Sequence, residues 1–222
     1  MLYFRGCTAR ENQTAIQEAT EKLLQLAGVD YHILDDEKCC GSVLLRTGFI
    51  DEARKQIEKN TEILKDEKII TSCAGCYKTL KEDYEGLDVI HISQLLSRLV
   101  DEGKLNFKKT DLNVTYHDSC HLGRHMEVFD EPRRVIENVA DIVEMKNSRE
   151  DSLCCGAGGG VKSAYPEIAL EMANSRIGQA LDTECKILIT ACPFCKLNLE
   201  NGELEVLDLC EFLVKYGDVY ES

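Results

Sequence analysis

The sequence has few positive charges and no long run of apolar residues. Its 26 lysines and arginines stand against 40 aspartates and glutamates, which gives a formal net charge of −14. An acidic surface repels phosphates, so we expect no nucleic-acid partner. No apolar stretch approaches the ~18 residues needed to cross a bilayer. The first six residues lead directly into Cys7 and lack the apolar region of a signal peptide. We therefore expect a cytoplasmic protein that meets a membrane only through a partner.

Two familiar cofactor motifs are also missing. There is no C-x-x-C-x-x-C-x-x-x-C-P run of the ferredoxin type, so electrons must arrive from another subunit or domain. The glycine-rich residues 156–160 suggest a P-loop, but Val161 stands where that motif needs glycine before the lysine. Close backbone packing around a cofactor explains the glycines better. The candidate cofactor-binding glycines are Gly41, Gly156, Gly158 and Gly159.

Cysteine, in contrast, is abundant. In a reducing cytosol, twelve cysteines favour metal binding or catalysis over disulfides. Five of them read C-x(31)-C-C-x(32)-C-x-x-C, and five more read C-x(33)-C-C-x(36)-C-x-x-C. The first set is Cys7, Cys39, Cys40, Cys73 and Cys76, and the second is Cys120, Cys154, Cys155, Cys192 and Cys195. The other two, Cys185 and Cys210, have no partner in the repeat, and we expect them to be small core residues.

The repeat extends beyond the cysteines. Residues 89–96 and 206–213 follow the two C-x-x-C motifs with the same apolar pattern. Such self-similarity indicates a duplicated unit of about 105 residues. We expect two pseudo-symmetric domains, residues 1–105 and 106–222, with the seam in the polar stretch from Asp101 to Asp111.

Each half alternates strand-like and helix-like segments, which predicts an α/β fold with parallel sheets covered by helices. The expected strands are residues 2–4, 31–34, 68–71, 114–116 and 187–189, and the expected helices include residues 51–64, 74–84 and 166–181. The motif cysteines would then lie at strand carboxyl ends or helix starts, where α/β folds bind ligands. Helix N-termini also favour thiolate, the form that binds metal.

Three kinds of site compete for these thiols. A lone C-x-x-C is typical of thiol–disulfide exchange, but here each pair has three further cysteines at repeated distances. Structural zinc needs only four cysteines, and adjacent cysteines fit its tetrahedral shell poorly. A cluster with several irons can use thiolates that approach from different sides. Iron–sulfur is therefore the favoured interpretation for both sites, with zinc at one site as the alternative.

Charged and imidazole side chains flank the second cysteine set. His117, His121 and His125 recur every four residues and would line one face of a helix, and a supporting or surface role is expected for them. Arg5, Arg124 and Lys162 can attract an anionic thiol substrate, but ordinary surface charge is the simpler interpretation.

The motifs resemble a known family. Cys39-Cys40-Gly41 and residues 154–160 (Cys-Cys-Gly-Ala-Gly-Gly-Gly) look like the two CCG (cysteine-rich) domains of heterodisulfide reductase. Residues 116–125 (Tyr-His-Asp-Ser-Cys-His-Leu-Gly-Arg-His) and 191–195 (Ala-Cys-Pro-Phe-Cys) are similarly characteristic, and the resemblance covers essentially the whole chain. It implies two noncubane [4Fe–4S] clusters, each held by one five-cysteine set.

The resemblance also implies an activity. In that enzyme the cluster pair cleaves the mixed disulfide of coenzyme M and coenzyme B into two thiols, in anaerobic metabolism. An electron-donating iron–sulfur, flavin or cytochrome subunit and a small thiol or disulfide substrate are then the expected partners. Similar domains occur in electron-transfer subunits for lactate, glycolate or glycerol-3-phosphate oxidation and in thiol-driven fumarate reduction. Those functions, and a zinc-bound structural module, are the alternatives to a heterodisulfide reductase-like oxidoreductase.

Overall fold

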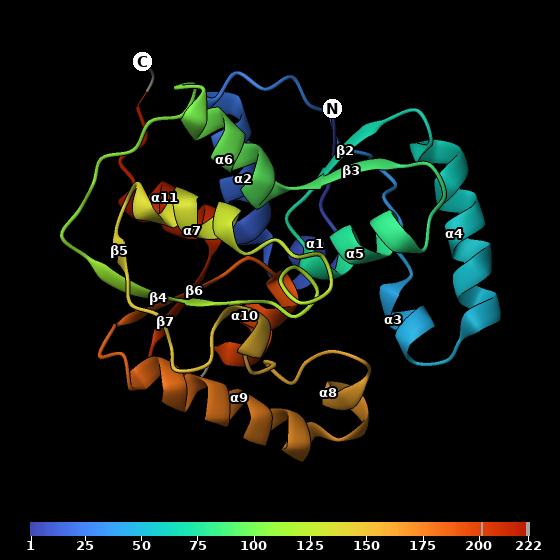
Figure 1. The fold of residues 1–222 in the computed structure, drawn as a ribbon. Helices are drawn as coiled ribbons and strands as arrows, with labels where there is room; N and C mark the ends of the chain where they lie inside the picture. Colours follow the sequence, from blue (N-terminus) through green and yellow to red (C-terminus); the bar gives the residue numbers. More distant parts are fainter. Residues whose placement is uncertain (201, 221–222) are drawn as a thin grey trace.

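The computed structural model describes residues 1–200 and 202–220. It contains two parallel sheets, one from each half of the sequence (Figure 1). The first has the order β1-β2-β3, from Leu2–Phe4, Lys68–Thr71 and Asp88–His91. The second has the order β5-β4-β6-β7, from Asp141–Ile142, Asn113–His117, Ile187–Thr190 and Glu205–Asp208. The expected α/β class with two repeated halves is confirmed.

The two sheets share one strand order. The strands β1, β2 and β3 correspond to β4, β6 and β7, and all pairs are parallel. The second sheet adds β5, whose place in the first half is taken by a single bridge between Leu2 and His32. The expected strand at residues 31–34 is therefore wrong, because only one residue of that apolar stretch pairs.

Helices cover both sheets. The first half contributes α1 to α6, which span Cys7–Asn12, Thr14–Leu26, Ser42–Arg46, Ile50–Leu64, Ala74–Glu82 and Ile92–Asp101. The second half contributes α7 to α11, which span Asp130–Glu137, Val161–Ala164, Pro166–Leu181, Pro193–Leu199 and Leu209–Tyr216. A short 3-10 turn lies at Arg149–Asp151. The expected helices are present, and the one that starts after Cys73 ends at Glu82, two residues early.

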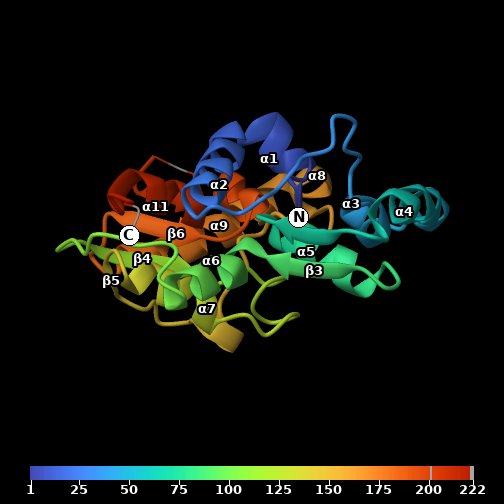
Figure 2. The same cartoon turned by 90° about the horizontal axis from the view of Figure 1, so that it is seen from above.

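The two halves interlock through their last helices. Each begins at a capping box, with His91 and Gln94 starting α6 and Asp208 and Glu211 starting α11. Helix α6 packs on α7 of the second half, and α11 packs on α2 of the first (Figures 1 and 2). One continuous apolar core results, running through both sheets. The division into domains at residue 105 stays a prediction, since each half completes the other's packing.

Helices α4 and α9 lie at the outer edges of the two halves (Figure 1). Ala53 and Ala169 are buried where these helices approach the vicinal cysteine loops. No helix in the described residues is long and apolar enough to pass through a membrane.

Candidate metal centre

The ten repeated cysteines all line one cavity. Their thiols interact in a single chain, in the order Cys7, Cys39, Cys40, Cys76, Cys73, Cys192, Cys195, Cys155, Cys154, Cys120. The Sγ atoms of Cys7 and Cys39 lie 3.8 Å apart, and those of Cys155 and Cys195 lie 3.3 Å apart. The order is the same from either end, and the two C-x-x-C motifs meet at its centre. The two predicted sites are therefore adjacent.

Parallel strands deliver these cysteines to one edge of each sheet. Cys7 follows β1 and Cys120 follows β4, while the C-x-x-C motifs follow the neighbouring strands β2 and β6. Cys73 is the N-cap of α5, and its Sγ accepts a hydrogen bond from the backbone N–H of Cys76 at 3.4 Å. Cys192 is the N-cap of α10. The placement at strand carboxyl ends and helix starts agrees with the expected topology.

The two vicinal pairs have the same local backbone. The N–H of Gly41 donates to Cys39 Sγ, and the N–H of Gly156 donates to Cys154 Sγ, each at 3.4 Å. Both glycines have positive φ, 83° and 86°. At Gly156 a side-chain Cβ would lie 2.6 Å from the carbonyl oxygen of Ala169, so only glycine fits there. Gly158 and Gly159 line the cavity directly.

A further glycine at the site was missed from the sequence. Gly6 adopts φ 81° and ψ 151°, and a Cβ there would lie 2.9 Å from Cys76 Sγ. It lets the chain before Cys7 pass against the C-x-x-C motif of the same set. Its position next to a cysteine, like that of Gly41, is the signal that could have identified it.

In the row of interacting thiols from Cys7 to Cys120, thiols with a lowered pKa are separated from one another by thiols with a raised pKa. Hydrogen bonds from Cys39 and Cys76 hold the pKa of Cys40 well below its ordinary value, and those from Cys195 and Cys73 do the same for Cys192. Hydrogen bonds from Cys120 and Cys155 lower the pKa of Cys154 to about 2.

The cysteines that donate these hydrogen bonds have raised pKa values. Without a cation, adjacent thiolates would repel one another in a buried site, so the protein alone favours thiolates that are not neighbours. Thiolate charge on all ten sulfurs needs a positive centre between them. The all-sulfur donor set fits a metal that prefers soft ligands, such as zinc or the iron of an iron–sulfur cluster.

Buried carboxylates hold the segments that precede Cys7 and Cys120. Glu37 accepts hydrogen bonds from the backbone N–H groups of Arg5 and Gly6, both at 2.9 Å. Asp118 forms a bidentate ion pair with Arg133, at 2.7 and 2.9 Å. Arg5 is itself buried and paired with Glu37, so the expectation of an ordinary surface charge was wrong for this residue.

The three histidines do not share a helical face. His117 is fully buried on β4, and desolvation lowers its pKa to about 3. Its ring nitrogen and the Sγ atoms of Cys155 and Cys195 all lie within 4.8 Å of one another. His121 lines the cavity near Gly75, in a turn rather than a helix, and its ring lies 5.4 Å from that of His125.

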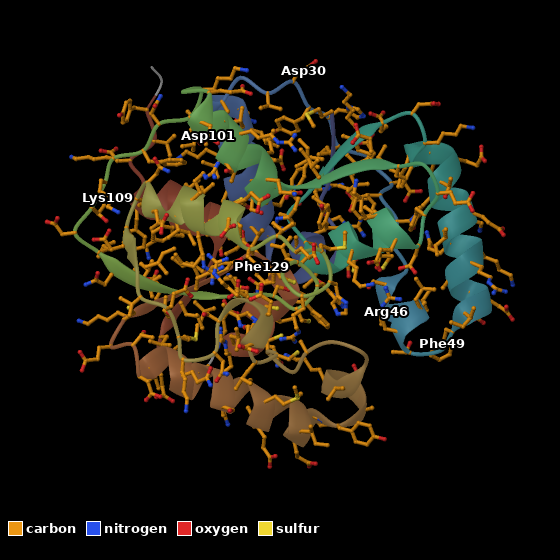
Figure 3. The ribbon with its side chains drawn as sticks, viewed as in Figure 1. Asp30, Arg46, Phe49, Asp101, Lys109 and Phe129 are labelled. Carbon is orange, nitrogen blue, oxygen red and sulfur yellow. The ribbon has the colours of Figure 1, made fainter. Side chains whose placement is uncertain are left out.

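Arg46 is a cation at the cavity that the sequence did not point to. It lies at the C-terminal end of α3 (Figure 3). It lines the cavity and pairs with Asp83 at 2.9 Å. Arg124 instead donates to the carbonyl of Ser152, and Lys162 donates to Asn198 at 2.7 Å. Neither Arg124 nor Lys162 lines the cavity.

Comparison with known proteins fits this geometry. The family model described as "Cysteine-rich domain" (CCG) matches residues 1–81 and again residues 114–200. The chain is 42% identical to one subunit of the dihydromethanophenazine:CoB–CoM heterodisulfide reductase of Methanosarcina acetivorans, covering 91% of this chain and 54% of that protein. It is 35% identical to one subunit of the CoM/CoB fumarate reductase of Methanothermobacter marburgensis, covering 97% and 46%.

A bacterial relative is similar over the same region. The probable iron-sulfur-binding oxidoreductase FadF of Bacillus subtilis is 36% identical, over 87% of this chain and 29% of its own length. The chain thus spans about half or less of the length of these curated relatives. Because the family model matches twice, once over each cysteine set, the chain belongs to the cysteine-rich CCG domain family.

Proposed function

We propose that the chain is an iron–sulfur oxidoreductase subunit that reduces a disulfide, such as the heterodisulfide of coenzyme M and coenzyme B, or runs the reverse reaction. The metal ligands would be Cys7, Cys39, Cys40, Cys73 and Cys76 at the first site and Cys120, Cys154, Cys155, Cys192 and Cys195 at the second. Each set would hold one noncubane [4Fe–4S] cluster. Residues 1–105 and 106–222 would be the two CCG domains that carry them.

The observation that carries this proposal is that both cysteine sets, including Cys73 and Cys192 where the sets meet, line one cavity. The shared cavity brings the two sites together, whereas a simple one-electron relay needs only a single site. Both sites open to the same cavity, so one substrate can meet both. A disulfide has two sulfurs and takes up two electrons, which matches two adjacent one-electron centres.

The overall reaction would be RSSR′ + 2e⁻ + 2H⁺ → RSH + R′SH. When bound, the paired clusters would supply the two electrons and offer an iron to each sulfur, which avoids a free thiyl radical. The protein's part is to hold the sites together and to shape the cavity. Apolar Val43 and Phe194 line it beside the cation Arg46, so the cavity suits a substrate with an alkyl stem and an anionic end. Electrons would come from an iron–sulfur, flavin or cytochrome partner.

A second candidate is an electron-transfer subunit that serves an organic-acid dehydrogenase or a thiol:fumarate reductase. Similarity to the fumarate reductase subunit and to FadF favours it. Such a subunit would pass electrons between a partner and an external acceptor and would not itself cleave a disulfide.

Metal analysis followed by a turnover assay tests both candidates. Anaerobically reconstituted protein should contain about eight irons per chain together with acid-labile sulfide. It should then release thiol from the heterodisulfide with a reduced viologen as electron donor. Full clusters without thiol release would support the relay function, and one or two zincs without sulfide would refute both.

Matched cysteine variants sharpen the test. Cys73→Ser and Cys192→Ser each alter one proposed ligand at the point where the sites meet, and each should reduce bound iron and abolish thiol release. Cys185→Ser is the control, because Cys185 is buried away from the cavity. It should keep the iron and sulfide of the parent protein.

A further inference from the structure

The two sites are alike in their cysteines but differ in what lies behind them. His117 stands three residues before Cys120, and Phe4 stands three residues before Cys7. Both lie at the end of equivalent strands and both are buried. The second site therefore has an imidazole where the first has a phenyl ring.

One nitrogen of His117 is fixed by a hydrogen bond from behind. Arg176 Nε donates to His117 Nδ1 at 3.0 Å. A neutral imidazole that accepts at Nδ1 carries its proton on Nε2. Within the described residues, Nε2 is buried and has no hydrogen-bond partner. The neighbouring acceptors are the sulfurs of Cys155 and Cys195. These two sulfurs and a ring nitrogen of His117 all lie within 4.8 Å of one another.

Arg176 is also unusual in its own surroundings. It is fully buried, and its guanidinium bonds to His117, the carbonyl of Asn147 and Gln179, at 3.0, 2.7 and 2.8 Å. No carboxylate in the described parts of the chain forms an ion pair with it. A buried guanidinium without a direct counterion is costly. The negative charge that acts on Arg176 comes from Asp118 and Glu144, which both pair with Arg133, and then from Cys195 of the second site.

At the position behind the first site that is equivalent to Arg176, the residue is neutral, although Arg46 on α3 lines the shared cavity. Arg176 lies eleven residues after Tyr165, the N-cap of α9, and Asn60 lies eleven residues after Phe49, the N-cap of α4. Asn60 donates to the carbonyl of Cys39 and to Tyr84, at 2.9 and 3.0 Å. It is neutral, and its contacts are with a carbonyl and a phenol. The pair Phe4 and Asn60 thus replaces the pair His117 and Arg176.

We propose that His117, held by Arg176, donates a hydrogen bond from Nε2 to a sulfur of the second site and makes the centre there more oxidising than the centre at the first site. The inference rests on the proposed iron–sulfur function. Reduction adds negative charge to a cluster, and a hydrogen bond to sulfur or a nearby cation stabilises that charge. Both effects raise the reduction potential of the second centre. His117 and Arg176 are positioning and tuning residues, since the cysteines remain the ligands.

A redox titration of the reconstituted chain, followed by electron paramagnetic resonance, tests this inference. Cys40→Ser and Cys155→Ser each disturb one cysteine set and thereby assign the signals to the two centres. In the parent protein the second centre should have the more positive midpoint potential. His117→Phe, which copies the first site, should shift the second centre to a more negative potential and leave the first centre unchanged. Arg176→Met should shift it in the same direction.

Two further variants separate tuning from packing. His117→Gln places an amide N–H near the position of Nε2 and should retain most of the parent potential. Phe4→Leu changes packing at the equivalent position of the first site and should move neither potential. The tuning role is refuted if His117→Phe holds full iron and leaves both potentials unchanged, or shifts both equally. Disulfide reduction by that same protein would leave the proposed function intact.

A spectroscopic measurement adds a direct test, made in a His121→Phe background because His121 also lines the cavity. In that background, protein with ¹⁵N-labelled histidine should show a weak nitrogen coupling to the paramagnetic second centre, as expected for an N–H···S hydrogen bond. A strong coupling would mean that His117 ligates iron directly, and the absence of any coupling would place it away from the centre. Either result overturns the inference. A chain that takes up neither iron nor sulfide would overturn this inference and the proposed function together.

Discussion

The contact between Gly6 and Cys76 makes a quantitative prediction for Gly6→Ala. With φ 81° and ψ 151°, Gly6 is in a region that other residues enter at a cost of about 1–3 kcal/mol. The new Cβ would also lie 2.9 Å from Cys76 Sγ and 3.6 Å from Cys73 Cβ, both buried. Overpacking of this kind costs about 1–3 kcal/mol. The two effects together should destabilise the fold by about 4 kcal/mol.

Gly28→Ala is the matched control. Gly28 also has positive φ, 64°, but a Cβ there meets no atom within 4 Å, so the variant should lose only about 1–2 kcal/mol. For a chain of this size, 1 kcal/mol lowers the melting temperature by about 2–4 °C. Anaerobic thermal denaturation followed by circular dichroism should thus show Gly6→Ala melting well below Gly28→Ala. Gly6→Ala should also bind less iron, since Cys76 must move. Equal melting temperatures in the two variants would refute the reasoning.

Three further predictions concern the ion pairs and the thiols. Asp118→Asn removes one of the two carboxylates that pair with buried Arg133, and should lower the free energy of unfolding by about 3–5 kcal/mol in thermal denaturation. Asp141→Asn, at an exposed ion pair, should lower it by less than about 1 kcal/mol. Burial raises the pKa of Glu205, but hydrogen bonds from Lys215 and Tyr216 outweigh burial and lower that pKa. The stabilising effect of Glu205 is therefore present above the ordinary pKa of 4.5 and is lost as the pH falls through the lowered pKa. The melting-temperature deficit of Glu205→Gln should therefore be full at pH 7 and disappear in acid, and a deficit that persists there would contradict this. Removing iron with a chelator should let a thiol reagent reach the cavity cysteines, while Cys185 and Cys210 react only after unfolding; early labelling of those two would argue against their burial.

The duplicated α/β scaffold was predictable because its signals are local or periodic. The helix that begins at Pro166 has proline at its first position and apolar residues at helical spacing, and it runs to Leu181 as expected. The strand expected at residues 31–34 was wrong because a short apolar run does not reveal whether a partner edge is available. His32 pairs with Leu2 alone, while the equivalent stretch of the second half forms β5.

The residues of the site were predictable, and the family resemblance implied a pair of clusters, but the cysteines at which the two sets meet were not predictable. The spacing of the cysteines identified two sets, and the helix and strand pattern placed them at one edge of each sheet. Nothing in the spacing indicated that Cys73 and Cys192 meet, because that contact depends on how α6 and α11 interlock the halves. The pairing of His117 with Arg176 joins residues 59 positions apart, and a contact between distant polar residues leaves no periodic trace in one sequence.

The two halves of this molecule are alike in the backbone around the thiols and differ in the side chains behind them. The backbone features that aim the thiols are kept in both halves, as Gly41 and Gly156 show by making the same hydrogen bond at the same distance. The residues behind the thiols have changed, so that one half has a neutral pair and the other has Arg176 and His117. Two equal centres would share an incoming electron evenly, whereas unequal centres give it a preferred place. If the pair cleaves one bond with two electrons as proposed, the shared backbone features would supply the close geometry, and the differing residues behind the thiols would set the order in which the centres fill.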